Sequence, residues 1–194
     1  PQPIASPAKA CHENIGMALI PEDRKTEGLM LPMTVRDNLS FAALDRVARR
    51  GIIDRDKEEE LIDGMVRLLA IKTAGLDIPV GALSGGNQQK VVIAKWLMRS
   101  PRLILLNDPT RGIDVGTKQE LYALLRRLAD QGAAILFYST DYDELIGCCD
   151  RVLVLYDGAI RRELVGAEIT ERALIASALN IKSGETGMQP GLGA

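Results

Sequence analysis

Short apolar runs alternate along the chain with segments of helical periodicity, and this alternation restricts the fold more than any other feature. Residues 103–106 and 133–138 are wholly apolar, as expected of strands in a parallel sheet that is covered on both faces. Similar runs at 16–20 and 151–156 predict two more strands. Because strands alternate with helices, we predict an α/β domain with a mainly parallel sheet.

A helix-rich block follows the first apolar run. Thr34 fits the N-cap of a helix over Val35–Ala48, since its hydroxyl can accept a bond from a free backbone N–H. Lys57–Leu69 carries apolar residues at helical spacing, and a third helix is expected over Gly85–Met98. We interpret residues 34–98 as a helical subdomain inserted into the α/β domain.

Further signals organise the rest of the chain. Glu22–Gly28 is expected to be a charged loop, and Thr117 with Glu120 has the spacing of a capping box that starts a helix. Asp157-Gly158 predicts a hairpin turn. Residues 1–181 are therefore predicted to form one domain. Residues 182–194 are Gly-rich and are expected to be a disordered tail.

Charge and composition exclude several function classes. The net charge is −2 with no basic block, which argues against nucleic acid as a partner because phosphate binding needs clustered Lys and Arg. His12 is the single histidine, and Cys11, Cys148 and Cys149 are expected to be reduced thiols. No apolar run approaches the ~18 residues of a membrane span. The chain begins at Pro1 without a signal peptide, so we expect a truncated or excised product.

The string Leu-Ser-Gly-Gly-Asn-Gln-Gln-Lys at 83–90 is the strongest chemical signal. Gly85 and Gly86 let the backbone approach a ligand closely, and a helix start offers free N–H groups with a positive dipole end. The Ser84 hydroxyl adds a donor, so the string suits the γ-phosphate of a nucleotide. The alternative is a plain serine N-cap beside a glycine turn.

A second signal lies at the end of the apolar run 103–106, where Asn107, Asp108, Pro109 and Thr110 follow. A buried strand that delivers polar residues at its carboxyl end is where phosphate enzymes hold Mg²⁺ and water. The alternative is a strand that ends in an Asx-Pro turn.

Together these motifs carry a family resemblance. The string at 83–90 resembles the signature motif of ABC-type ATPases, in the variant typical of importers for ribose, galactose and xylose. Pro21–Lys25 and Asp108–Gly116 are similar to the C-terminal ATP-binding half of those tandem proteins. The resemblance covers about residues 6–181, with four motifs in order. It implies part of a P-loop NTPase fold, with ATP and Mg²⁺ as cofactors.

The resemblance also implies roles for the residues of the signature and the D-loop. Ser84, Gly85, Gly86 and Gln88 would reach across a dimer to the γ-phosphate held by the other half. Asp114, with Gly112 and Ile113, matches the D-loop, which lies along the dimer seam.

Four further positions carry implied catalytic or metal roles. Glu22 takes the place of the Q-loop glutamine near Mg²⁺ and the membrane contact. Asn107 stands at the Walker B position, where the family has a magnesium-organising Asp, and Asp108 replaces the catalytic Glu. Thr140 takes the switch position. Asn107 lacks the charge that would hold Mg²⁺ through its water shell, and Asp108 is one methylene shorter than Glu.

An absent motif limits what the chain is expected to do alone. The sequence contains no Gly-x-x-x-x-Gly-Lys-Ser/Thr string, the Walker A loop that cradles the β- and γ-phosphates. The resemblance implies an ABC-family ATPase, but we predict that this chain alone is inactive because the loop is absent. In the fold that the resemblance implies, the strand before the Walker A loop lies between the strands matching 133–138 and 151–156. Without that strand, each of these two strands is expected to have an open edge.

These motifs predict an ATP-binding fragment of a sugar-importing ABC transporter that supplies the signature motif to a nucleotide sandwich dimer. Its expected partners are another ABC ATP-binding half, a membrane permease docked through Glu22–Ala48, and indirectly a periplasmic sugar-binding protein. The expected location is cytoplasmic, on the inner face of the cell membrane. The alternative is a non-catalytic binding or regulatory fragment that pairs with an intact half. A role as an ABC-type protein in DNA repair or translation is disfavoured by the sugar-type string at 83–90, and the charge gives no support for it.

Overall fold

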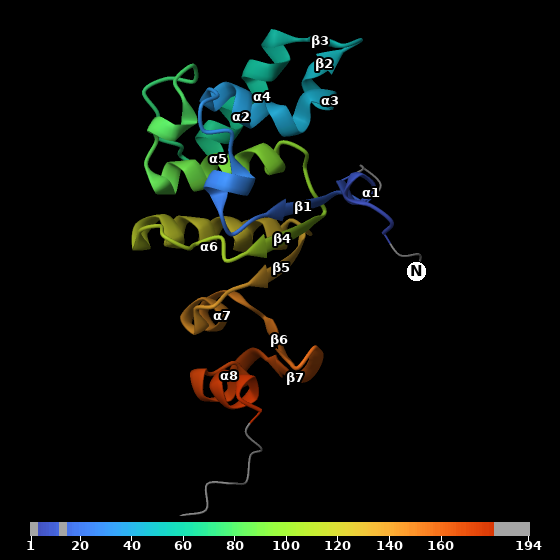
Figure 1. Ribbon diagram of the computed structural model, residues 1–194, viewed down its shortest axis with the longest axis vertical. Coiled ribbons are helices and arrows are strands. Elements are labelled where there is room, and N and C mark those ends of the chain that lie inside the picture. The colour runs from blue at the N-terminus through green and yellow to red at the C-terminus, as the bar shows by residue number, and fades with distance from the viewer. Residues whose placement is uncertain (1–3, 12–14, 181–194) are drawn as a thin grey trace, which may run out of the picture. The chain divides into compact units, whose positions relative to one another are not determined.

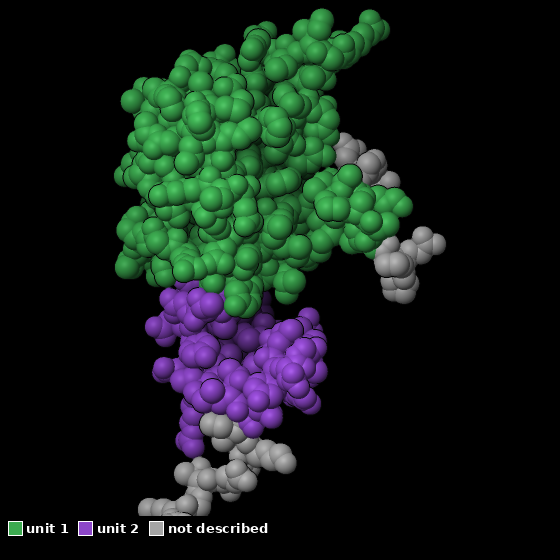
Figure 2. All heavy atoms as spheres, viewed as in Figure 1, with its two compact units in different colours: residues 1–138 green, residues 139–194 purple. Residues whose placement is uncertain are grey.

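The computed structural model describes residues 4–11 and 15–180 (Figure 1). The chain divides into two compact units, Pro1–Tyr138 and Ser139–Ala194 (Figure 2). His12 and the predicted tail at 182–194 lie outside the described residues. A short helix α1, Pro7–Cys11, precedes the sheet of the first unit.

Three parallel strands form the sheet of the first unit, in the order β1-β4-β5. They are β1 at Met17–Ile20, β4 at Leu103–Asn107 and β5 at Ala134–Tyr138. The parallel sheet predicted from the apolar runs is therefore confirmed for these three strands, and their carboxyl ends meet at one edge of the sheet.

One face of this sheet is buried and the other is open. Alternate residues Ala18, Ile20, Ile104 and Leu106 are almost fully buried. The last three belong to one core cluster with residues of two helices, α5 (Gly85–Leu97) and α6 (Val115–Asp130). The residues between them face away, because side chains alternate along a strand. Leu19 and Leu136 are 50% and 61% exposed. The expectation that residues 133–138 are buried on both faces is therefore wrong for the described part of the chain.

The predicted helix over Val35–Ala48 is interrupted. The structure has α2 at Val35–Ser40, a 3-10 turn at Phe41–Ala43 and α3 at Leu44–Val47. The Ser40 hydroxyl donates to the Arg36 carbonyl at 3.1 Å, a bond back to the preceding turn that often bends helices. After α3 come two short antiparallel strands, β2 (Ala48–Arg49) and β3 (Ile52–Ile53), and then α4 (Arg55–Leu68).

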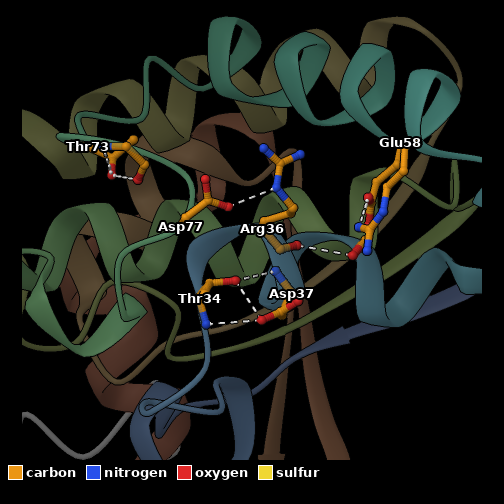
Figure 3. Close-up of polar contacts among 9 residues, drawn as sticks. Thr34, Arg36, Asp37, Glu58, Thr73 and Asp77 are labelled. Carbon is orange, nitrogen blue, oxygen red and sulfur yellow. Dashed lines mark hydrogen bonds and ion pairs between the residues drawn. The ribbon is translucent and has the colours of Figure 1, made fainter. Parts of the chain in front are cut away.

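Polar contacts hold this helical block in place (Figure 3). The Thr34 hydroxyl accepts a bond from the Asp37 N–H, and the Asp37 carboxylate accepts from the Thr34 N–H, which confirms the predicted N-cap as a full capping box. Arg36 Nε donates to Asp77 at 3.1 Å, so α2 is tied to the segment that leads into the signature string. The buried Glu58 pairs with Arg55 at 2.6 Å.

Two smaller predictions are wrong. The expected charged loop contains a π-helix, Arg24–Gly28, whose N-cap Asp23 accepts a bond from the Lys25 N–H at 2.8 Å. The helix predicted to start at a Thr117–Glu120 capping box starts at Val115, with Asp114 as its N-cap. The Asp114 carboxylate accepts both the backbone N–H and the hydroxyl of Thr117, each at 2.9 Å. A carboxylate has acceptor capacity for both, so the cap lies three residues earlier.

The second unit has its own small core. Strands β6 (Arg151–Tyr156) and β7 (Ala159–Val165) form the predicted hairpin. Asp157 and Gly158 both have positive φ, as a tight two-residue turn requires. Helices α7 (Tyr142–Cys148) and α8 (Glu171–Ala178) flank the hairpin in sequence, and five residues form a separate buried cluster: Val152, Val154, Leu164, Ile169 and Leu174. Among described residues, β6 pairs with β7 alone, so it is not a strand of the parallel sheet.

Candidate functional site

Ser84 starts α5 at the head of the 83–90 string. Its backbone is extended (φ −61°, ψ 155°), and its hydroxyl oxygen accepts the Asn87 N–H at 3.4 Å. The alternative of a serine N-cap is thus correct, because the Ser84 hydroxyl caps α5. An N-cap serine is nevertheless compatible with ligand binding, since its O–H hydrogen takes no part in capping.

Asn87 fixes the direction of that hydroxyl. Asn87 Oδ1 accepts the Lys72 N–H at 2.7 Å. This bond sets the orientation of the amide, because a backbone N–H can only donate. Asn87 Nδ2 then donates to Ser84 Oγ at 2.9 Å. The two acceptor positions of Ser84 Oγ are therefore occupied, and the hydroxyl hydrogen remains as a donor toward a ligand. Sequence reasoning missed the role of Asn87, because it depends on a bond to Lys72, 15 residues earlier in the chain.

Gly86 has a packing reason to be glycine, whereas the nearest atom to a Cβ on Gly85 is the end of a flexible arginine side chain that can move aside. A Cβ on Gly85 would lie 2.7 Å from Nη2 of Arg24, and a Cβ on Gly86 would lie 2.7 Å from Oγ1 of Thr117. Both distances are below any normal contact. The start of α5 is consequently pressed against the π-helix at Arg24–Gly28 and against the start of α6.

Gln88 is turned inward, in contrast to Ser84. It is 6% exposed, and its Nε2 donates to the Leu83 carbonyl at 3.0 Å. Its Oε1 is buried without a partner among the described residues. A phosphate contact by Gln88 stays a prediction, and this side-chain position gives it no support.

At the carboxyl end of β4, the two predicted metal and catalytic positions differ. Asn107 is exposed and lies opposite Tyr138 of β5 in the register. Asp108 is 7% exposed and has φ +40°, a left-handed conformation that Asp tolerates better than most residues. Its N–H donates to the Tyr138 carbonyl at 3.0 Å, and its carbonyl accepts the Arg111 N–H at 3.2 Å. Such backbone strain often marks functional sites.

The segment after Asp108 contacts two other predicted site segments. Arg111 forms an ion pair with Glu22, and its carbonyl accepts Nη1 of Arg24 at 3.2 Å. Hydrogen bonds from the Thr117 N–H and then from the Thr117 hydroxyl hold the pKa of Asp114 below its ordinary value. The Glu22 region, the signature string and the D-loop segment are therefore brought together within the first unit.

Thr140 belongs to the second unit. It precedes Asp141, the N-cap of α7, whose N–H donates to the Ser139 hydroxyl at 3.0 Å. The Ser139 hydroxyl donates in turn to the buried Glu144 carboxylate at 2.7 Å. The switch role of Thr140 stays a prediction.

A phosphate group fits this arrangement better than a magnesium ion does. The free Ser84 O–H and the N-terminus of α5, a helix of 13 residues, are donors suited to a phosphate oxygen. For Mg²⁺, Asn107 offers a neutral amide and the Glu22 carboxylate is paired with Arg111. No group of three or more His, Cys, Asp or Glu side chains able to hold a metal ion occurs among the described residues. By themselves these residues do not make a magnesium site.

Comparison with known proteins identifies one family. The model of the ABC transporter family matches residues 2–111. The ribose import ATP-binding protein RbsA 1 of Mesorhizobium japonicum is 82% identical over 194 residues, which is 100% of this chain and 37% of that protein. RbsA 1 of Rhizobium johnstonii is 74% identical over 93% of this chain and 35% of its own length. The chain thus spans little more than a third of these curated relatives.

Solved structures show the same fold. The ADP conformation of MJ1267, an ATP-binding cassette of an ABC transporter, superposes with a TM-score of 0.66 at 22% identity, covering 89% of this chain and 70% of that one. CbiO1 from Clostridium perfringens, part of the transporter complex cbiONQ, gives a TM-score of 0.68 at 21% identity, covering 94% and 70%. In the parts of the chain that the structure describes, no helix is long and apolar enough to cross a membrane.

Proposed function

Because the chain belongs to the ABC transporter family of ATP-binding proteins, we propose that it is the signature-bearing part of an ATP-binding subunit for sugar import. The names of its curated relatives, which are ribose import ATP-binding proteins, support ribose or a related sugar as the cargo. In this role the chain completes a nucleotide site whose phosphate-binding loop is supplied by another ATP-binding half.

The observation that carries the proposal is the state of Ser84. Asn87 occupies both acceptor positions of its hydroxyl oxygen, which leaves one outward hydrogen at a helix N-terminus. That group can donate to a γ-phosphate oxygen but has nothing to offer a cation. Because Gly85 and Gly86 have no side chains, the backbone next to Ser84 is open to a ligand.

The remaining site residues have supporting parts in this proposal. Asp114 and Thr117 hold the start of α6 against Gly86, so the D-loop and the signature would move together. The Glu22–Arg111 ion pair links the D-loop to the segment expected near the permease. Bound ATP would bring Mg²⁺ with it, with Asn107 and Glu22 as the residues of this chain proposed to lie nearest the ion, although alone they do not fit it.

Docking to a permease is proposed for the helical block. Phe41 and Leu44 are apolar and exposed there, with Phe41 57% exposed, and the exposed Met33 immediately precedes the block. Large apolar side chains on an outer surface are typical of protein contacts when they gather together. The proposed place of the chain is therefore the inner face of the cell membrane, held there by the permease.

Nucleotide-dependent pairing tests the proposal. The chain is mixed with the N-terminal ATP-binding half of a ribose-type relative whose hydrolysis has been disabled, and association is followed by sedimentation velocity. We expect ATP to promote a one-to-one complex and ADP not to. Ser84→Arg should abolish the complex, while Thr170→Arg, which removes an N-cap of α8 in the second unit, should leave it unchanged. Equal association with ATP, ADP and no nucleotide would contradict the proposal.

A non-catalytic regulatory role is the second candidate, favoured by the neutral Asn107 at the position where the family has a magnesium-organising Asp. Reconstitution with the N-terminal half and its permease separates the two roles. Sugar-stimulated ATP hydrolysis supports the transport role, whereas complex formation without stimulated hydrolysis supports the regulatory one.

A further inference from the structure

A pocket of about 280 Å³ opens between the end of α4, α5 and α6, within the first unit. Its floor is apolar and consists of buried side chains from three segments: Leu69, Ile93, Leu121 and Leu124. Ligand sites commonly have about 300–1,000 Å³ and a mostly apolar lining with a few polar groups. At about 280 Å³ this pocket lies just below that range, so it has room only for a compact molecule, of about two fused rings at most.

The polar part of the lining is cationic overall. The lining contains two cationic side chains, Lys90 and Arg127, and one carboxylate, Glu120. Lys90 Nζ donates to Glu120 at 2.5 Å and to the Ala70 carbonyl at 3.2 Å, which leaves one of its three hydrogens. Arg127 is exposed at the rim. An anionic group at the mouth would thus meet a net positive charge, whereas a cation would meet repulsion.

Gln89 adds an unfilled donor to the same lining. It is 2% exposed, and its Nε2 is buried without a partner among the described residues. Buried amide donors are nearly always paired with protein, water or ligand. The terminal torsion of a glutamine is broad, so a modest rotation would turn this N–H₂ toward an acceptor in the pocket.

We propose that this pocket binds a small organic anion with a compact apolar body and one carboxylate. The apolar floor takes the body, Arg127 and the remaining Lys90 hydrogen take the carboxylate at the rim, and Gln89 donates to an acceptor farther in. The site is separate from Ser84, but its wall includes Thr117, which also contacts Gly86. A bound molecule would therefore change the environment of Gly86 in the signature string through Thr117.

Calorimetric titration of the 194-residue chain with 2-naphthoate tests the proposal, with neutral 2-naphthylmethanol of the same shape as comparison. We expect the carboxylate to bind about tenfold more tightly, as for a charge-assisted hydrogen bond. Arg127→Gln should remove that advantage while leaving the affinity for the alcohol unchanged. In ¹H–¹⁵N spectra, 2-naphthoate should shift the amide resonance of Gly86.

Two substitutions on α6 make the location of the site falsifiable. Ala123 lines the pocket and is exposed, so Ala123→Phe should fill the mouth and abolish binding without disturbing the core. Gln119→Phe, at an exposed position of the same helix outside the pocket, should leave binding unchanged. Absence of 2-naphthoate binding, equal affinity for acid and alcohol, or binding that survives Ala123→Phe would each overturn the proposal.

Discussion

Replacing Gly86 by alanine sets two effects of opposite sign against each other. Gly86 lies in the first turn of α5, where alanine ordinarily favours the helix by about 0.5–1 kcal/mol. The new Cβ, however, would lie 2.7 Å from Thr117 Oγ1 and 3.2 Å from Thr117 Cγ2. Overpacking of this kind costs about 1–3 kcal/mol. We therefore expect Gly86→Ala to lower the free energy of unfolding by up to about 2.5 kcal/mol, the largest difference between these effects.

Removing the obstructing side chain should reverse the sign. Thr117→Ala deletes the two atoms nearest the new Cβ and leaves Asp114 Oδ2 at 3.3 Å, so in that background Gly86→Ala should stabilise the chain by at most about 0.5–1 kcal/mol. Gly64 provides a matched control, because it lies inside α4 and a Cβ there would meet no atom within 4 Å. Gly64→Ala should stabilise the chain by a similar amount in both backgrounds.

Urea unfolding of the four members of this double-mutant cycle, with and without Gly64→Ala, measures these effects. If Gly86→Ala changes stability equally in the wild-type and Thr117→Ala backgrounds, α5 and α6 are not pressed together at this point. The structural link between signature and D-loop would then be wrong.

Three further predictions concern charge, the sheet edge and catalysis. Hydrogen bonds depress the folded-state pKa of Asp114, so its contribution to stability is complete above about pH 4 and is lost as the pH falls through the lowered pKa. The difference in urea midpoint between wild type and Asp114→Asn should therefore shrink on acidification. A difference that stays constant with pH would refute this. We expect the isolated chain to self-associate and to bind hydrophobic dye through the open edge of β5, and Leu136→Lys should reduce both, because it places a charge on the exposed face of an edge strand; unchanged sedimentation would contradict it. Asn107→Asp combined with Asp108→Glu should give no phosphate release by the isolated chain, since neither change supplies a phosphate cradle, and turnover by the double variant would disprove this.

Elements with a strong local signal could be predicted from the sequence. Alternation of apolar runs with helical segments predicted the parallel strands β1, β4 and β5, and the dipeptide Asp157-Gly158 predicted the β6–β7 hairpin. The Thr34 cap was also predictable, because its partner lies only three residues away. In each case residues close together along the chain carry the signal for the element, although the parallel strands pair with residues far away in the sequence.

The site depends more on tertiary contacts, which local patterns do not reveal. The bond between Asn87 and the Lys72 N–H joins segments 15 residues apart, and the inward turn of Gln88 depends on the loop at 81–83. The break in the helix after Ser40 reflects a side-chain bond that competes with the helical backbone. The order of polar residues in the 83–90 string therefore indicated a phosphate site, but it could not show which of them face outward.

ATP hydrolysis by the reconstituted pair shows whether the Ser84 hydroxyl acts on a nucleotide held by another ATP-binding half. Phosphate release is measured for the N-terminal half mixed with wild-type chain, Ser84→Ala, Ser84→Arg or Thr170→Arg, with circular dichroism as the control for folding. We predict reduced release with Ser84→Ala, background release with Ser84→Arg and a wild-type rate with Thr170→Arg. A wild-type rate with correctly folded Ser84→Arg would contradict this role of Ser84.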